Sequence, residues 1–498
     1  MQVDLTPHLE AAPTVGILFS KDELRGEALT KLARQLPYGM HLVGGHMSVV
    51  AGTDATGSLV QTNSVCPHSR GVANEVGLSL GRFPEANVKS FAVRGTSDAE
   101  WQAELRSQGA LNPGWKVFLL VGRHRATHEI VEYVQAAHPA AAIIGGMATG
   151  ESLYRIHRGQ VETMREGIVG LMFSGEVPLA AFVSRGARGL GEGAYSFTAE
   201  DLKKVDGQDS ESHLQMLTHV TGPSGKRQPA LMATIESLQD SGQGSGMCIG
   251  LTADASNGFE LSHLDNRMVV QSQSALLVPP PRGDELTSWS EGQLRFYSFD
   301  PDSCKLDLTR RLRAVRDEAE RKGERMLGAV MFTCGGRTHQ FFGEPAFDAS
   351  TFARTFEGVP LIGMYAGGEI GPPLLADAPP SKAFQVGGAT MHGFTAIFGL
   401  FIVPPRQPRA SALAFADDDE VAAAFAELRK HAEPVPPLGS AGSSSTGSGD
   451  SVLPSSLAEL RALPVKALKL AMSRLGLTPT PGSEKEDLVR EIAEKAGI

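Results

Sequence analysis

The chain has 498 residues, long enough to bury the cores of two or three domains, and its apolar and charged fractions are ordinary for a globular protein. Its formal net charge of −10 argues against a broad nucleic-acid-binding surface, which needs clustered Lys and Arg. The four cysteines are scattered and no apolar leader opens the chain, so we expect a reducing, intracellular location, cytoplasmic by default, with nucleus and plastid left open.

The first part of the chain alternates strand-like and helical patterns. We expect a strand, a helix and a strand in residues 14–19, 21–36 and 42–43, and again in residues 115–121, 126–137 and 141–144. Residues 72–93 hold two strands split by a Pro-containing turn, and residues 168–173 and 179–183 have the pattern of a hairpin-like pair.

The polar residues 201–245, broken by the turn Gly222–Gly225, read as a domain junction. After it we expect strands at 268–270, 275–278, 294–299 and 327–333, a helix at 306–321 and a last apolar strand at 393–403. No apolar run is long enough to cross a bilayer, so we expect no membrane association. The recurrence of one helix with several strands predicts a mixed α/β (α+β) fold of repeated β-rich units with covering helices.

The C-terminal part changes composition. A linker is expected at 405–452, with a helical stretch at 421–431 and an almost pure Gly, Ser, Ala and Thr tether at 438–451. Residues 453–498 resume as two short helices, which predicts a small helical module.

One motif recurs. Ile144–Glu151 and Ile362–Glu369 both follow a strand with a glycine-rich turn and a glutamate, and Leu42–Gly45 is a weaker copy, so the chain reuses one supersecondary unit. Glycines permit close backbone approach to a ligand, whereas the glutamates could bind a ligand amine or have a structural role. The candidate ligand-binding residues of these turns are Gly145, Gly146, Gly150, Glu151, Gly367, Gly368 and Glu369.

A second candidate is the turn that ends the strand at 327–333, formed by Cys334, Gly335, Gly336 and Arg337. A thiol beside a guanidinium can be an activated nucleophile, but no partnering His or Asn spacing supports catalysis. A buried small side chain is the alternative for the cysteine. For Arg337 we favour a ligand-facing role, because its planar fork suits a carboxylate or phosphate.

The remaining motifs are weak. His124 and His128 are four residues apart, but a third metal ligand is missing, and a solvated helix face is the better interpretation. Gly186–Gly191 looks like a nucleotide loop without the strand–helix context that such a loop needs. We therefore predict no metal, no cofactor and no catalytic residues.

Together the segments resemble both halves of the FIST domain, the "F-box and intracellular signal transduction" domain. The resemblance is carried by Ala141–Glu151, Gly167–Leu171, Ser184–Gly191, Gly328–Arg337, Phe341–Gly343 and Val359–Pro372. It implies an N-terminal FIST domain at 14–200 and a C-terminal one at 210–404. It also implies a non-enzymatic sensor or signal-transduction protein that binds a small, amino-acid-like ligand. In this arrangement Arg337 would face the acidic group of the ligand, and Glu369 or Glu151 would face its amine.

Two alternatives stay open. FIST domains also follow an F-box in ubiquitin-ligase substrate receptors. The second hypothesis is therefore a protein-interaction scaffold that acts in ubiquitin-dependent degradation and has ligase components as partners. A thiol enzyme that uses Cys334 ranks last. The tail at 453–498 is similar to SAP-like modules, which often bind nucleic acid. Its basic and acidic residues offset each other, so we favour a protein contact for the tail.

Overall fold

The computed structural model describes residues 13–53, 59–61, 76–191, 193–204, 214–240, 246–264, 268–279, 289–376 and 388–404, together with Val489. The chain divides into two compact units, residues 1–408 and 409–498. The predicted linker at 405–452, its helical stretch and the SAP-like module lie outside the described residues, apart from Val489. The elements below belong to the first unit.

The described residues of the first unit form three parallel strand pairs, and in each pair the two strands are joined through helix. In chain order the pairs are β1 (Val15–Ser20) with β2 (His41–His46) through α2 (Gly26–Gln35), β7 (Val117–Arg123) with β8 (Ala142–Met147) through α4 (Thr127–Ala137), and β24 (Arg325–Cys334) with β25 (Leu361–Ala366) through α7 (His339–Phe342) and α8 (Phe347–Thr355). These are the units in which the sequence motif recurs. The predicted mixed α/β fold with repeated β-rich units is confirmed.

The recurring glycine has the same place in each pair. Gly44, Gly145 and Gly363 lie opposite Leu18, Leu120 and Met331, respectively. A Cβ on Gly44 or Gly145 would overlap the carbonyl oxygen of the residue opposite, and one on Gly363 would come within 2.7 Å of the Met331 side chain. Close approach between backbone segments, rather than a ligand, therefore requires glycine at this position of the motif.

We expect Gly145→Ala to lower the free energy of unfolding by about 1–3 kcal/mol, because the backbone of β7 must move to admit the methyl group. The matched control is Gly39→Ala, since a Cβ on the exposed Gly39 would meet no atom within 4 Å. Urea unfolding followed by circular dichroism measures both. Equal free energies for the two variants would contradict the packing explanation.

The strand that follows each parallel pair joins the sheet of another pair. β3 (Val50–Thr53) pairs with β25, β9 (Leu153–His157) with β2, and β26 (Glu369–Gly371) with β8. The next long strands return to their own units, where β5 (Val76–Gly81), β11 (Gly167–Gly175) and β29 (Ala396–Val403) pair antiparallel with β1, β7 and β24. The three units thus exchange strands in a closed cycle.

The hairpin-like pair expected at 168–173 and 179–183 is wrong. β11 lies in the sheet of β7, while β12 (Leu179–Ser184) pairs with β29 in another sheet. Likewise β6 (Ala86–Val93), the strand after β5, pairs with β11. At these two connections the chain crosses to a neighbouring sheet, and the alternation of apolar residues carries no information about which sheet accepts the strand.

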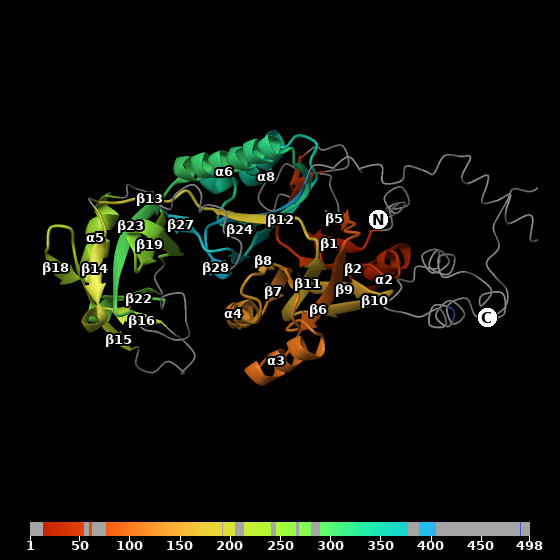
Figure 1. The fold of residues 1–498 in the computed structure, drawn as a ribbon, viewed down its shortest axis with the longest axis horizontal. Coiled ribbons are helices and arrows are strands. Elements are labelled where there is room, and N and C mark those ends of the chain that lie inside the picture. The colour runs from red at the N-terminus through yellow and green to blue at the C-terminus, as the bar shows by residue number, and fades with distance from the viewer. Residues whose placement is uncertain are drawn as a thin grey trace, which may run out of the picture. The chain divides into compact units, whose positions relative to one another are not determined.

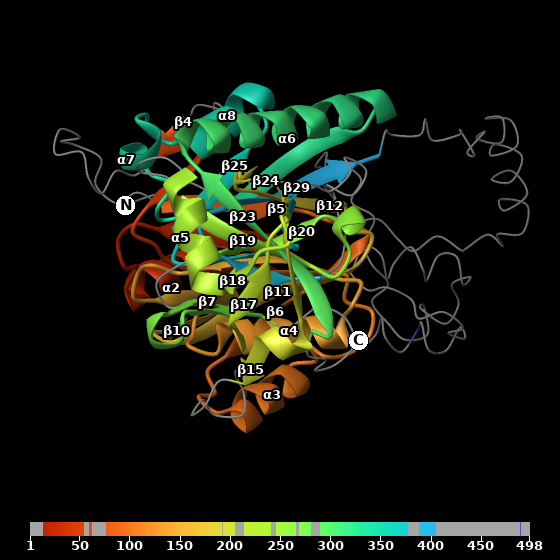
Figure 2. The same ribbon diagram turned by 90° about the vertical axis from the view of Figure 1, so that its left-hand side faces the viewer.

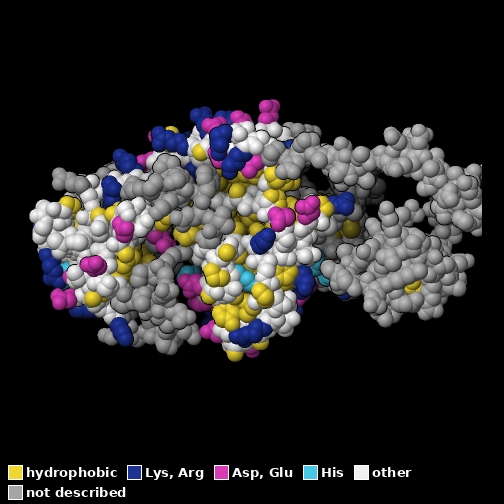
Figure 3. Space-filling view, viewed as in Figure 1, with side chains coloured by type: hydrophobic (Ala, Val, Ile, Leu, Met, Phe, Trp, Pro, Cys, Tyr) yellow, Lys and Arg dark blue, Asp and Glu magenta, His cyan; other side chains and the backbone are white. Residues whose placement is uncertain are grey.

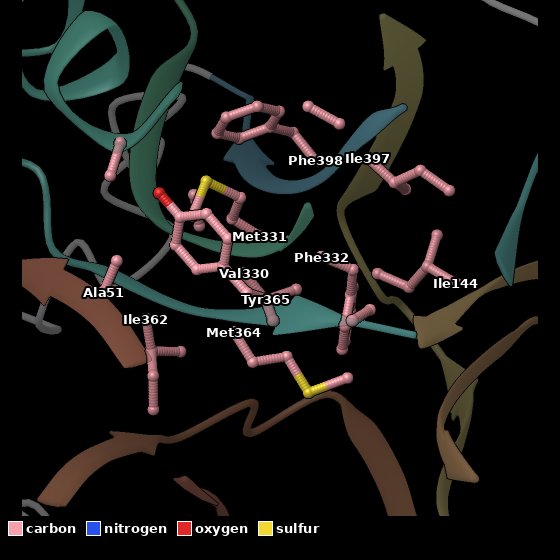
Figure 4. Packing of buried hydrophobic residues seen from close by; sticks show 14 of the residues in the cluster. Ala51, Ile144, Val330, Met331, Phe332, Ile362, Met364, Tyr365, Ile397 and Phe398 are labelled. Atoms are coloured by element: carbon pink, nitrogen blue, oxygen red, sulfur yellow. The ribbon is translucent and has the colours of Figure 1, made fainter. Parts of the chain in front are cut away.

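A single apolar core joins the three units. It contains residues of β1, β7, β24, β25 and β29, and Figure 4 shows Ile144 of β8 beside Phe332 of β24 and Met364 of β25. Figures 1 and 2 both show α6 (Pro301–Lys322) and α8 lying together along the sheet of β24 and β25. The buried face of α6 (Leu308, Leu312 and Val315) belongs to the same core, as its predicted amphipathic pattern requires.

An inserted part lies between β12 and α6 in the chain, and β27, from after α6, adds one edge strand to it. Its larger sheet contains β18 (Arg227–Pro229), β17 (His219–Thr221), β14 (Tyr195–Thr198), β23 (Glu291–Phe299), β19 (Gly246–Thr252), β20 (Phe259–His263) and β27 (Leu375–Ala376), with β13 (Arg188–Gly189) also pairing with β23. The smaller sheet contains β15 (Leu202–Lys204), β16 (Gln215–Leu217), β22 (Ala275–Val278) and β21 (Val269–Val270). The range 201–245, read from the sequence as a domain junction, contains β15 to β18 and α5 (Ala230–Asp240) in its described residues, and Gly222–Gly225 is the turn between β17 and β18.

The remaining elements lie at sheet edges and on the surface. They are β4 (Leu59–Gln61), β10 (Gln160–Met164), β28 (Thr390–His392) and α3 (Asp98–Ser107). The sequence analysis missed α3, although Ser97 and Glu100 form a capping box at its start.

Surface charges on α6 compensate one another. Figure 3 shows basic and acidic side chains mixed over this helix, where Arg316 contacts Asp317 and Glu318 contacts both Arg321 and Lys322. A helix with paired charges offers no unopposed cationic face to a polyanion. No helix in the described ranges combines the length and apolar character that a membrane crossing requires.

Candidate functional site

The three motif turns meet at the carboxyl ends of the parallel strands. A backbone N–H in each turn donates to a carbonyl of another turn, and the three bonds form a closed cycle: His46 to Ser152 (2.7 Å), Met147 to Gly368 (2.8 Å) and Tyr365 to Val49 (3.1 Å). The candidate residues of the sequence motif therefore do come together in space, although they lie 218 positions apart in the chain.

Most glycines of this junction are needed for packing. Gly145, Gly146 and Gly150 are buried, and a Cβ on Gly146 would come within 2.8 Å of Met364, while one on Gly150 would overlap His46. Gly368 is also buried, with Met391 at 3.0 Å from its Cβ position. At Gly146 and Gly150 glycine serves the contact between units, and at Gly145 it serves the contact between β7 and β8 within one unit.

Two other glycines have no such packing reason. Gly335 and Gly367 are exposed, and a Cβ on them would have its nearest neighbours at 3.4 Å and 3.8 Å, which is ordinary contact distance. Their backbones are joined across the strand ends, since Gly335 N–H donates to Ala366 O at 2.8 Å. Exposed backbone without side chains therefore borders the ends of β24 and β25, where α/β folds bind ligands.

The two motif glutamates have different environments. Glu151 is exposed, whereas the side chain of Glu369 is fully buried. Thr395 donates two hydrogen bonds to Oε2 of Glu369, from its backbone N–H at 3.1 Å and its hydroxyl at 2.8 Å. The repeat therefore does not give the two glutamates one shared structural role.

Cys334 lies next to this buried carboxyl. Burial raises the pKa of Glu369 to about 7, against the opposing hydrogen bonds from Thr395. Burial and the nearby Glu369 charge raise the pKa of the half-buried Cys334 thiol to about 11. The thiol is therefore protonated at neutral pH, and a protonated thiol is a weak nucleophile.

Arg337, which the sequence assigned to a ligand, is committed elsewhere. Its guanidinium is fully buried and donates from Nε and Nη2 to the Asp348 carboxylate at 2.9 Å and 2.7 Å. Thr333 donates to the same carboxylate. Asp348 is the second residue of α8, so this ion pair fastens the start of the helix to the end of β24.

Sequence reasoning missed a second buried arginine. Arg185 follows β12 and is 1% exposed. It donates from Nη2 to Gly393 O at 2.8 Å, its Nη1 lies 3.5 Å from Cys248 Sγ, and its own carbonyl accepts from the Cys304 thiol at 2.7 Å. The sequence signal was an arginine directly after a buried strand and before a glycine, which alone does not identify a partner.

Comparison with known families gives these regions names. A model described as the FIST N domain matches residues 14–200, and one described as the FIST C domain matches residues 290–372. The chain carries FIST N and FIST C domains. Arg185 and the junction glycine Gly145 lie in the FIST N match, and Cys334, Arg337 and Glu369 lie in the FIST C match, so the candidate site is built from both.

Two mycobacterial proteins are similar to part of this chain. An uncharacterized protein of Mycobacterium bovis is 29% identical over 290 residues, and one of Mycobacterium tuberculosis is 26% identical over 288 residues. Each alignment covers 55% of this chain and 64% of the relative. The chain thus spans less than two thirds of the length of the curated relatives it matches.

The histidine pair singled out in the sequence has separate roles. His124 is buried, and its Nδ1 accepts from the N–H of Ala126, while His128 faces Glu132 on the surface of α4. The predicted solvated face therefore applies to His128 alone, because His124 precedes the helix. Within the described ranges no three His, Cys, Asp or Glu side chains form a metal-binding group.

Proposed function

We propose that the protein is a non-enzymatic signal-transduction protein that senses a small, amino-acid-like ligand inside the cell. The observation that carries the proposal is the pair of Cys334 and the buried Glu369 beside the exposed glycines Gly335 and Gly367. This pair lies where α/β folds place ligands, and the FIST domains support a sensory role. Cys248, Cys304 and Cys334 are free thiols, which supports a reducing compartment.

The raised pKa of Cys334 supports binding over catalysis. A thiol enzyme needs a base or a positive charge that stabilises the thiolate. Here the neighbouring Glu369 opposes thiolate formation, and the Arg337 guanidinium is already paired with Asp348. A neutral thiol and a buried carboxyl can instead recognise a polar ligand by hydrogen bonding.

We expect an amino acid to raise the melting temperature of the wild type, since a ligand at 100 times its Kd adds about 2.7 kcal/mol to the free energy of unfolding. Thermal-shift measurements with each amino acid in turn, at concentrations above millimolar, identify the amino acid that binds. Glu369→Gln removes the charge at the site and should abolish the shift, while Glu151→Gln at the exposed motif position should keep it. No stabilisation by any amino acid would contradict the sensor function.

A second candidate function is a protein-interaction scaffold, similar to the substrate-receptor part of an F-box ubiquitin ligase. Helix α5 favours it, because Met232, Ile235 and Leu238 are 45%, 39% and 46% exposed at three-residue spacing. Exposed apolar side chains on one helix side are typical of protein contacts. Affinity capture separates the two functions: cullin-complex components recovered by the wild type and lost with Ile235→Glu would favour the scaffold.

A further inference from the structure

Two buried side chains of opposite charge each leave one polar atom without a partner. Nε of Arg185 and Oε1 of Glu369 have no hydrogen-bond partner of normal geometry among the described residues, although the two side chains are 1% and 0% exposed. The Cys334 thiol lies close enough to the Glu369 carboxyl to lower its pKa, but it completes no hydrogen bond to Oε1. An unpartnered buried donor or acceptor loses the hydrogen bonds that it makes to water in the unfolded chain. Two such atoms of opposite charge in one region call for an explanation.

A single segment joins these side chains. Gly393 O accepts from Arg185 Nη2, and two residues later Thr395 donates to Glu369 Oε2 from both its N–H and its hydroxyl. The Arg185 charge also lowers the pKa of Glu369, against the dominant effect of burial. The two groups are thus near each other and held by one stretch of chain, yet no direct ion pair between them is formed in the described structure.

The residue between these two contacts is Phe394, and its backbone is unusual. Its φ of 61° lies in the left-handed region, which a bulky residue adopts only under strain. Its half-buried ring packs against Phe299 and Phe341, with ring centroids at 4.5 Å and 4.7 Å. A Cβ on Gly336 would come within 2.8 Å of the ring, so glycine there allows the ring to lie against the Cys334 turn.

We propose that Arg185 and Glu369 form the two ends of a buried site for a small zwitterionic molecule, and that the Phe394 ring closes this site beneath the Cys334–Arg337 turn. The inference rests on the proposed ligand-sensing function and deepens it. It assigns the ligand's acidic group to Arg185 rather than Arg337, because the charge of Arg337 is already paired with Asp348, even though Nη1 of Arg337 also lacks a partner.

The ligand class follows from the two free atoms. A guanidinium N–H suits a carboxylate, and a carboxylate oxygen suits an ammonium group. A molecule with both groups satisfies both buried atoms at once, whereas a molecule with one group leaves the other unpaired.

Binding by the wild type tests the two-ended site without any substitution. For the best amino acid of the thermal-shift set, calorimetry compares it with its two half-ligands, the matching carboxylic acid without the amine and the matching amine without the carboxyl group. Each half-ligand should bind at least about 30-fold more weakly, because one buried charge stays unpaired. A half-ligand that binds as tightly as the amino acid would overturn the buried site and leave the sensor function intact.

Arg185→Gln should weaken the same amino acid at least about 30-fold, whereas Arg188→Gln, an exposed arginine three positions along the chain, should leave Kd unchanged. Unchanged binding by a folded Arg185→Gln variant, checked by circular dichroism, overturns the assignment of Arg185. If that variant does not fold, the half-ligand comparison decides. If no amino acid of the set binds the wild type, both the buried site and the sensor function are overturned.

The closing role of Phe394 has its own measurement. Phe394→Gly suits the left-handed backbone and removes the ring, so stopped-flow association and dissociation rates should both rise about tenfold or more, with a smaller change in Kd. Ser274→Gly, at another left-handed residue (φ 52°) in the inserted part, should leave both rates unchanged. Wild-type rates in Phe394→Gly would show that the ring does not close the site.

Discussion

Replacing Asp348 by alanine is expected to lower the free energy of unfolding by about 3–5 kcal/mol, because it leaves the guanidinium of Arg337 buried without its counter-charge. Both side chains are fully buried, and the pair has two parallel hydrogen bonds. Asp348 also accepts a hydrogen bond from Thr333, so the substitution leaves a hydroxyl of β24 without its acceptor as well.

Urea unfolding of Asp348→Ala measures this loss, and Asp317→Ala is the control. Asp317 pairs with Arg316 on the exposed side of α6, where removal of one partner should cost less than about 1 kcal/mol. The double variant Arg337→Met with Asp348→Leu should recover much of the loss, since replacing a buried ion pair by apolar side chains is often neutral. Similar losses in Asp348→Ala and Asp317→Ala would contradict the burial argument.

This ion pair shows why the sequence misplaced Arg337. A strand followed by Cys-Gly-Gly-Arg correctly indicated a turn at the end of β24, and an arginine fork does suit an acidic ligand. The acidic group that it meets belongs to Asp348, eleven positions along the chain at the start of α8. Nothing in the local pattern states that this helix folds back onto the strand end, so the partner had to come from the tertiary structure.

The repeat was predictable because one physical constraint produces it. Wherever the backbone of a parallel neighbour approaches too closely for a Cβ, as at Gly44 and Gly145, the residue must be glycine, and the constraint leaves the same mark in each unit. The exchange of strands was not predictable. β11 and β12 are separated by three residues yet lie in different sheets, and the apolar alternation of each strand would fit either sheet.

The same limit applies to the candidate site. The structure brings Cys334 and Glu369 together because Cys334 ends β24, and Glu369 begins β26 just after β25, the parallel neighbour of β24. Arg185 and Thr395 reach the same region from β12 and β29, which are antiparallel neighbours far from the motif in sequence. Glu151 and Glu369 also look alike in sequence, but only coordinates reveal that one is exposed and the other buried.

The burial of Glu369 leads to the second large effect, a stability that falls as pH rises. The pKa of Glu369 is raised from 4.5 to about 7 by burial. Below pH 4.5 the carboxyl is protonated in both the folded and the unfolded chain, so it contributes no difference. Between the two pKa values only the unfolded chain ionises, and the folded state loses stability until the pH passes about 7. The full loss is about 3 kcal/mol.

Glu369→Gln removes this titration while keeping an acceptor for Thr395. Relative to the wild type, the variant should therefore gain about 3 kcal/mol in free energy of unfolding between pH 5 and pH 8.5. Urea unfolding across this range measures the difference, and Glu151→Gln, at the exposed motif position, should follow the wild type throughout. A pH-independent gap between Glu369→Gln and the wild type would mean that the carboxyl does not change its charge in this range. A saturating ammonium-bearing ligand should lower the pKa of Glu369, and the pH dependence of the wild type should then flatten, since the bound cation stabilises the ionised carboxyl in the folded state.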